Sequence, residues 1–154
     1  MDSRIIQGRL EDVDVISQLF NEYRQFYGQA DDLPLARSFI AERLCDNSSI
    51  IFLAVDSHDL GLGFVQLYLG FSSISTKPVL NLNDLYVTKH ARCVGLGVKL
   101  MKLVIQYARD HDISKLVLET QEANQPARSL YTSLGFEVDN DFLTYSLDIK
   151  RQLK

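Results

Sequence analysis

The sequence predicts an α/β fold: one domain built on a mixed sheet. Apolar residues at helical spacing alternate along the chain with apolar runs of strand length. Residues 80–120 form a predicted strand, helix and strand, which requires a parallel pair joined by a right-handed crossover. The 154 residues, of which 46% are hydrophobic and 23% charged, suit one globular domain over residues 1–154.

The N-terminal part is predicted to form a short strand and two helices. The strand contains Ile5 and Ile6. Apolar residues at spacings of three and four then predict helices over residues 11–26 and 35–44, which Gly28 separates.

Three strands are expected next, over residues 50–55, 63–69 and 79–87. These runs are mostly apolar and are bounded by turn-forming residues. Residues 58–61 predict a hairpin turn between the first two strands, and the Ser/Thr-rich residues 71–78 separate the second strand from the third.

The remaining chain is predicted to form a long helix over residues 95–109, a buried strand over residues 115–120 and a helix over residues 125–134. Gly135 follows this last helix at the position where glycine often ends one. Two further strands are expected to close the chain, over residues 136–138 and 142–147.

Charge and cysteine content exclude several classes of protein. The net charge of −4 argues against a protein that coats nucleic acid, because such binding needs a basic face. Two cysteines and three scattered histidines do not form a disulfide framework or a zinc site, so no metal is expected. No signal-peptide pattern is visible, and the longest strongly apolar run is far shorter than the ~20 residues of a membrane span. We therefore expect a cytoplasmic protein without a nucleic-acid or membrane partner.

A glycine-bearing helix start, preceded by a strand and a loop, indicates an anion site within residues 81–97. The free N–H groups and the dipole of a helix N-terminus attract phosphate, and Gly95 and Gly97 leave room for a diphosphate to approach the backbone. The dinucleotide fingerprint is excluded because Leu100 replaces its third glycine, and the P-loop pattern is absent. The glycines alone suit a structural turn equally well. Positive side chains precede the helix at Lys89, His90 and Arg92.

Two motifs resemble signatures of the Gcn5-related N-acetyltransferase (GNAT) superfamily. Arg92-x-x-Gly95-x-Gly97 after an apolar strand is similar to the first, R/Q-x-x-G-x-G/A. A second segment, at the expected distance, resembles the second signature of the superfamily: Asn124-x-x-Ala127-x-x-Leu130-Tyr131-x-x-x-Gly135-Phe136. The resemblance covers essentially the whole chain. It implies a central, mostly antiparallel mixed sheet with a splayed parallel strand pair, flanked by about four helices. Residues 21–27 and 82–87 further resemble the branch of Hpa2-like and diamine-acetyltransferase-like enzymes.

The resemblance implies acetyl-CoA as the donor and a primary amine of a small molecule as the acceptor, joined in a ternary complex. It places the diphosphate on residues 92–98 and the pantetheine arm along residues 85–87, where a backbone N–H polarises the thioester carbonyl. Asn124 would contact the coenzyme across the splayed strands, and Asn is also typical of a helix N-cap. The coenzyme-binding residues so implied are Leu85, Tyr86, Val87, Arg92, Cys93, Val94, Gly95, Leu96, Gly97, Val98, Asn124 and Ala127.

Two catalytic residues are predicted. Tyr131 corresponds to the family's general acid, which protonates the departing thiolate; the alternative is a tyrosine that packs on the sheet. The acceptor must lose a proton, because an amine with a pKa of ~10.4 is neutral in only about one molecule in 2,500 at pH 7. Diamine acetyltransferases carry a glutamate at the position of Asn83 in this sequence. Asparagine cannot act as a base, so Asp84 is the catalytic candidate. The predicted acceptor-binding residues are Glu22, Tyr23, Asn83 and Glu119, of which the two glutamates are also candidate bases.

Several alternatives stay open. Cys93, at a helix start near His90, would support covalent catalysis if its thiol were the nucleophile. The acceptor would be a lysine or N-terminus if the enzyme acted on proteins, and a chain without turnover would be a coenzyme A sensor. A homodimer is a further hypothesis, formed by pairing of the closing strands.

Overall fold

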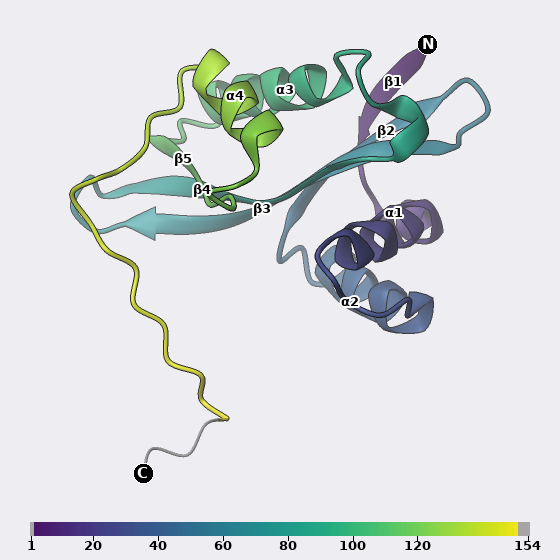
Figure 1. Cartoon of the computed structure of the whole chain (residues 1–154), viewed down its shortest axis with the longest axis horizontal. Helices are drawn as coiled ribbons and strands as arrows, with labels where there is room; N and C mark the ends of the chain where they lie inside the picture. The colour runs from purple at the N-terminus through teal and green to yellow at the C-terminus, as the bar shows by residue number, and fades with distance from the viewer. Residues whose placement is uncertain (1, 151–154) are drawn as a thin grey trace. The chain divides into compact units, whose positions relative to one another are not determined.

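The computed structural model of the protein describes residues 2–150, and a five-stranded sheet is its main feature (Figure 1). Two short 3-10 turns, η1 (Leu10–Asp12) and η2 (Lys89–Ala91), accompany the helices and strands. In chain order the strands and α-helices are β1 (Ser3–Gln7), α1 (Val13–Phe26), α2 (Leu33–Cys45), β2 (Ile50–Asp56), β3 (Gly61–Ser72), β4 (Lys77–Val87), α3 (Leu96–Asp110), β5 (Lys115–Leu118) and α4 (Gln125–Ser133).

The chain divides into two compact units, Met1–Glu119 and Thr120–Lys154. The first unit contains all the strands found in residues 2–150 and the helices α1 to α3, and the second contains α4. No helix in the described part of the chain combines the length and the apolar composition needed to cross a membrane.

The sheet has the order β1-β2-β3-β4-β5 and is antiparallel except for β4 and β5. Helix α3 connects these two parallel strands, which confirms the predicted parallel pair and the mixed α/β class. Pairing joins Val79–Leu82 to Lys115–Leu118, whereas β4 continues to Val87. The parallel strands therefore part after Leu82, and residues 83–87 have no strand partner on that side within residues 2–150.

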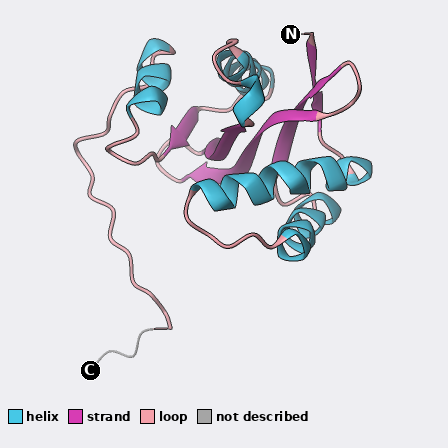
Figure 2. Cartoon of the chain, turned by 45° about the vertical axis from the view of Figure 1, so that its right-hand side comes forward, coloured by secondary structure: helices cyan, strands magenta, loops and turns pink. Residues whose placement is uncertain are grey.

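Helices cover both faces of the sheet: α1 and α2 lie on one face and α3 on the other (Figures 1 and 2). Strand β2 shows the division, because its alternate residues Ile51 and Leu53 join the core under α1 and α2. Phe52 points the other way, and its ring lies 5.5 Å from that of Tyr107 on α3. A strand buried on both faces is apolar throughout, which explains the unbroken apolar run in the sequence.

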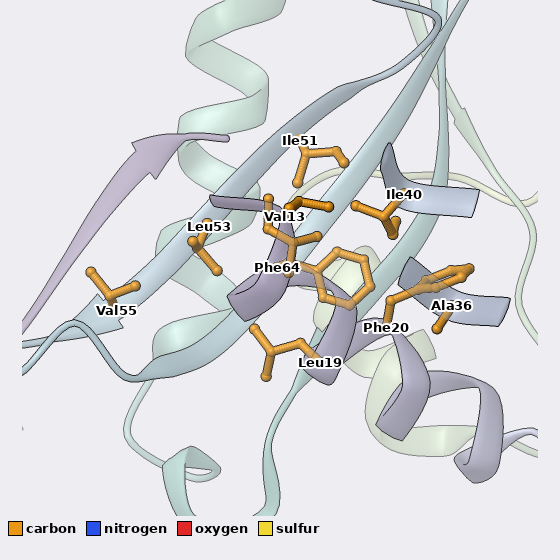
Figure 3. Close-up of a cluster of buried hydrophobic side chains, with 10 residues drawn as sticks. Val13, Leu19, Phe20, Ala36, Ile40, Ile51, Leu53, Val55 and Phe64 are labelled. Carbon is orange, nitrogen blue, oxygen red and sulfur yellow. The ribbon is translucent and has the colours of Figure 1, made fainter. Parts of the chain in front are cut away.

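The core under α1 and α2 is built around Phe64 of β3, which is fully buried (Figure 3). Its ring centroid lies 6.3 Å from that of Phe20 on α1. Replacing such a phenylalanine by alanine typically costs about 3–5 kcal/mol. This packing holds the C-terminal half of α1 beside β3 and β4. The cluster comprises Val13, Ile16, Leu19, Phe20, Ala36, Ile40, Ile51, Leu53, Val55 and Phe64.

The expected hairpin turn and the glycine helix ends are confirmed, whereas the loop expected over residues 71–78 is shorter, because β3 continues to Ser72 and β4 begins at Lys77. The carboxylate of Asp56 accepts hydrogen bonds from the backbone N–H groups of His58 and Leu60, which closes the hairpin between β2 and β3. Gly28 and Gly135 follow α1 and α4 with φ values of 85° and 93°. Only glycine adopts this left-handed conformation without strain, so both helices end where the sequence predicts.

The prediction of two closing strands, over residues 136–138 and 142–147, is wrong. Residues 136–149 contain no strand, and nearly all their side chains are exposed, including Phe142 (78%) and Tyr145 (90%). A strand gains backbone hydrogen bonds only when it lies against another edge. Within the described residues the sheet contains only β1 to β5, so this apolar segment has no paired edge.

Candidate active site

The end of β4 presents an open backbone edge. Thr88 N–H donates to Leu62 O of β3, so in the alternating pattern of an antiparallel ladder the N–H and C=O groups of Leu85 and Val87 point away from β3. This is the side on which β5 has already ended at Leu118. The separation of β4 from β5 therefore leaves the N–H groups of Leu85 and Val87 and the C=O group of Leu85 without a ladder partner on that side within residues 2–150, while Val87 O accepts a hydrogen bond from Arg92.

The N-terminus of α3 follows directly in the chain. Gly95 is its N-cap, with φ 78°, and as a glycine it has no side chain with which to cap the helix. A Cβ added to Gly95 would meet no atom within 4 Å, so space lies open at this helix start. The first N–H groups of α3, from Leu96 to Val98, have no partner within the helix and suit an anion. Since the side chain of Leu96 is buried in the core, only its backbone is available there.

The loop before α3 is exposed. Cys93 has φ 65°, a left-handed conformation that a cysteine adopts with strain, and its side chain and that of Val94 are exposed. Arg92 does not extend along this loop: its Nε donates to Val87 O at 2.9 Å. Its guanidinium carbon lies 5.7 Å from the ring centroids of Phe26 and Tyr86. Arg92 therefore ties the loop to β4 and to the end of α1.

Helix α1 contributes Glu22 to the same end of β4. Thr88 Oγ1 donates a hydrogen bond of 2.9 Å to Glu22 Oε2. Glu22 also hydrogen-bonds the side chain of Tyr86, and burial together with the negative charge of Glu22 raises the pKa of Tyr86. The structure thus brings Glu22 next to the predicted coenzyme-binding strand.

Asp84 is the buried carboxylate of this region, with 3% of its surface exposed. Gln66 Nε2 donates to Asp84 Oδ2 at 2.5 Å, and Asn83 Nδ2 donates to Asp84 Oδ1 at 3.1 Å. The side chain of Tyr23 on α1 also hydrogen-bonds this carboxyl group. Three of the predicted residues, Tyr23, Asn83 and Asp84, are therefore in direct contact.

Burial raises the pKa of Asp84 above its usual value, and the hydrogen bonds from Gln66, Tyr23 and Asn83 lower it by less. A carboxylate with a raised pKa accepts a proton more readily than an exposed one, which suits a general base. Burial raises the pKa of Tyr68 on β3, and the negative charge of Asp84 raises it further.

The other predicted residues lie at the end of β5 and in the second unit. Glu119 directly follows β5 and is exposed. Asn124 caps α4, and its side-chain oxygen accepts the N–H of Ala127 at 3.3 Å. Tyr131 is buried (9% exposed), and its ring centroid lies 5.8 Å from that of Phe136. The N-cap role expected for Asn124 is thus confirmed.

Gln66 and Ser49 belong to the Asp84 network, although the sequence analysis assigns them no role. Ser49 Oγ donates to Gln66 Oε1 at 2.8 Å. A glutamine within the apolar run of β3 is the signal that points to a buried polar partner. No three His, Cys, Asp or Glu side chains in residues 2–150 are grouped so that they could hold a metal ion.

Comparison with known proteins gives one consistent family. The Acetyltransferase (GNAT) family model matches residues 15–136. An uncharacterized N-acetyltransferase of Bacillus subtilis, YhfO, is 41% identical over 145 residues, which are 94% of this chain and 97% of that protein. A D-amino-acid N-acetyltransferase of Saccharomyces cerevisiae is 28% identical over 90% of this chain and 89% of its own length.

A solved structure supports the same assignment. The crystal structure of a probable acetyltransferase matches with a TM-score of 0.90 and 39% identity, over 97% of this chain and 99% of that chain. The exposed edge of β4 and the uncapped start of α3 fit acetyl-CoA, since they offer unpaired amides to its pantetheine arm and its diphosphate. The chain belongs to the GNAT family of acetyltransferases, for which acetyl-CoA is the co-substrate.

Proposed function

We propose that this protein, as a single domain over residues 1–154, transfers the acetyl group of acetyl-CoA to a primary amine of a small molecule. A polyamine and an amino acid are the acceptor types considered, and the amine attacks the thioester directly in a ternary complex. The name of the yeast relative supports a small amine, because that protein is a D-amino-acid N-acetyltransferase.

In this proposal the backbone from Arg92 to Val98 holds the diphosphate. The N–H groups at the start of α3 and the room above Gly95 support this placement. Leu85 and Val87 hold the pantetheine arm, and one of their N–H groups polarises the thioester carbonyl. Bound acetyl-CoA supplies the activated acetyl group. Asn124 and Ala127 of α4 are proposed as further coenzyme contacts.

The acceptor amine is proposed to bind between the end of α1 and β4. Glu22 and Asp84 supply the negative charge that an ammonium group needs, and Tyr23 supplies an aromatic face. Asp84 takes the proton of the ammonium group directly or through one water, and the nitrogen lone pair then attacks. Asn83 and Glu119 complete the proposed acceptor site.

Tyr131 is proposed to protonate the departing thiolate. A thiol has a pKa near ~8.5, so a hydroxyl group with a higher pKa gives a modest but useful rate increase. This role comes from the match of Tyr131 to the second GNAT signature.

A single observation carries the acceptor proposal: Asp84 is buried and directly precedes the open edge of β4. The proton acceptor and the groups proposed to hold the thioester are therefore neighbours on one strand, as direct attack requires. Burying a carboxylate is costly even when it is hydrogen-bonded, as Asp84 is, so a buried carboxylate beside the open edge is a candidate functional group.

We also propose a homodimer. Leu143, Tyr145, Leu147 and Ile149 alternate along the extended C-terminal segment and are 61–90% exposed, so they share one apolar face if the segment pairs as a strand. In the described part of the chain β5 pairs with β4 alone, and its other edge suits the segment of a second copy. A cytoplasmic location and the lack of a nucleic-acid or membrane partner remain predictions.

The experiment that tests the activity measures thiol release from acetyl-CoA with polyamines, amino acids and basic peptides. Turnover with a small amine supports the proposal, whereas turnover with peptides alone favours a protein acetyltransferase. Coenzyme binding without turnover on any acceptor would favour a sensor.

Initial rates with both substrates varied test the order of events. Direct attack in a ternary complex gives intersecting double-reciprocal lines, and Cys93→Ser remains active. Parallel lines together with an inactive Cys93→Ser would show that the cysteine carries the acetyl group.

A further inference from the structure

Gln66 is a fully buried polar side chain in a strand whose neighbouring residues, Val65 and Leu67, are buried and apolar. Its backbone already pairs with β4 through the ladder, so its amide side chain is not needed to hold the sheet together. Burying an amide is unfavourable unless both of its ends are hydrogen-bonded.

Both ends of the Gln66 amide have partners, and these partners fix its orientation. An ionised carboxylate only accepts hydrogen bonds, so the NH2 group of Gln66 faces Asp84 Oδ2, at 2.5 Å. The amide oxygen then faces Ser49, whose hydroxyl donates to it at 2.8 Å. The three side chains form a directed chain of hydrogen bonds from the half-buried Ser49 to Asp84.

A β-bulge brings Asp84 to this chain. Leu67 pairs with Leu82 and Gln66 pairs with Asp84, so Asn83 is an additional residue in β4. In a regular ladder without the bulge, Asn83 would pair with Gln66, and Asp84 would share the face of Leu82, which is the face of α3. The bulge turns Asp84 toward the α1 face, where its cross-strand partner is Gln66.

The two oxygens of Asp84 are consequently unequal. Oδ2 is bound by the fully buried Gln66, whereas Oδ1 is bound at 3.1 Å by Asn83, whose side chain is exposed; Tyr23 also hydrogen-bonds the carboxyl group. The longer bond to an exposed side chain is the one that an incoming amine can replace.

We propose that Gln66, oriented by Ser49, is a positioning residue for acetyl transfer: it holds Oδ2 of Asp84 so that Oδ1 receives the proton of the acceptor amine. This inference rests on the proposed function. In the step, one N–H bond of the ammonium group breaks, its electron pair stays on nitrogen for attack on the thioester carbon, and an O–H bond forms at Oδ1. A C–N bond forms at the thioester carbon and the C–S bond breaks, so coenzyme A leaves as a thiolate. The nitrogen loses its second proton, which balances the proton that the thiolate takes up.

The charged and titratable groups around Asp84 come from three elements. Tyr23 on α1 hydrogen-bonds the carboxyl group, and Tyr68 on β3 interacts with its charge. Arg43 on α2 interacts with Tyr68. Burial raises the pKa of Asp84, and Gln66 provides the largest opposing contribution. Loss of the Gln66 donor therefore raises this pKa further.

The test uses Gln66→Leu and the pair Ser49→Ala and Ser49→Thr. The side-chain carboxyl carbon of Asp84 is titrated by NMR in each protein without substrates, and kcat/KM is measured against pH. We expect the titration midpoint in Gln66→Leu to move up by about one pH unit or more, since a charged hydrogen bond is lost. The acidic limb of the rate profile moves with it, while the KM for acetyl-CoA stays unchanged. Ser49→Ala moves the titration midpoint of Asp84 and the acidic limb of the rate profile in the same direction, but less than Gln66→Leu does. Ser49→Thr, which keeps the hydroxyl group, resembles the wild type.

An unchanged Asp84 titration in folded Gln66→Leu would overturn the inference. If Gln66→Leu does not fold, the two variants of the half-buried Ser49 provide the test. Equal titration midpoints of Asp84 in Ser49→Ala and Ser49→Thr would then overturn the inference. Failure of the proposed function gives a different result, because a fully active Asp84→Asn removes Asp84 as the base whether or not Gln66 controls its titration.

Discussion

Gly95 offers the sharpest test of coenzyme binding at the start of α3. Alanine at this position must adopt φ near 78°, but its methyl group would meet no atom within 4 Å. Gly28 after α1 provides a matched control, because it has φ 85° and equally open space around an added Cβ. Gly95→Ala and Gly28→Ala therefore impose the same backbone strain at two different places.

The expected magnitudes separate strain from binding. A left-handed residue other than glycine costs about 1–2 kcal/mol, so both variants lose about this much free energy of unfolding. Each kcal/mol lowers the Tm of a domain of this size by about 2–4 °C. Only Gly95→Ala places a methyl group where the diphosphate must approach the N–H groups of α3. Losing one hydrogen bond to a charged group costs about 1.5–3 kcal/mol, which raises the Kd for coenzyme A roughly tenfold to a hundredfold.

Urea unfolding and calorimetric titration with coenzyme A measure the two effects on the wild type and both variants. We expect similar losses of stability in the variants and a loss of affinity in Gly95→Ala alone. Equal coenzyme A affinity in all three proteins, or an equal loss in Gly28→Ala, would refute the placement of the diphosphate.

Three further predictions concern the leaving group, the buried carboxyl group and the C-terminal segment. Tyr131→Phe should lower kcat by more than it changes the KM for acetyl-CoA, and an unaltered kcat would remove Tyr131 as the acid. Since burial raises the pKa of Asp84 in the folded state, the folded protein binds a proton more tightly than the unfolded chain. The free energy of unfolding should therefore fall as pH rises from about 3.8 through the folded pKa, and urea titrations of Asp84→Asn should lack this fall. Sedimentation velocity should show a dimer that Tyr145→Glu dissociates and Ser146→Glu, on the opposite face of the segment, does not; a wild-type monomer would contradict the proposed dimer.

The sequence was sufficient for the elements from β1 to α4, because there the local patterns and the tertiary structure agree. The strand expected to be buried over residues 115–120 is the edge strand β5, which ends at Leu118 and is only half-buried on one face. Both faces of β2 are buried, so its apolar run directly indicates a central strand. The long amphipathic α3 between two strands required the parallel pair that the structure contains. The segment over residues 142–147 has the alternation of a strand, but a pattern in one strand says nothing about whether an edge is available to pair with it.

The site was predictable in its motifs and not in its polar network. Asp84 and Tyr23 were identified as functional candidates, yet their contact depends on where α1 packs. The role of Gln66 depends on the pairing register and on the additional residue Asn83 in β4. A shift of one residue reverses the face of every following side chain, and neither composition nor spacing reveals such a shift.

The pH dependence of kcat/KM in Asp84→Asn tests the central claim most directly, namely that Asp84 removes the proton from the acceptor amine. General base catalysis contributes about 10²–10⁴-fold, so we expect at least a hundredfold loss at pH 7. The variant must use the amine that is already neutral, a fraction that rises tenfold per pH unit below the pKa of the acceptor, which is ~10.4 for a lysine-like amine and ~8 for an α-amine. A plot of log kcat/KM against pH should therefore rise with a slope of one for Asp84→Asn. The wild-type plot should be flat above the pKa of Asp84, so the two plots approach each other as pH rises. Wild-type activity in Asp84→Asn, or a loss that is the same at every pH, would contradict the account.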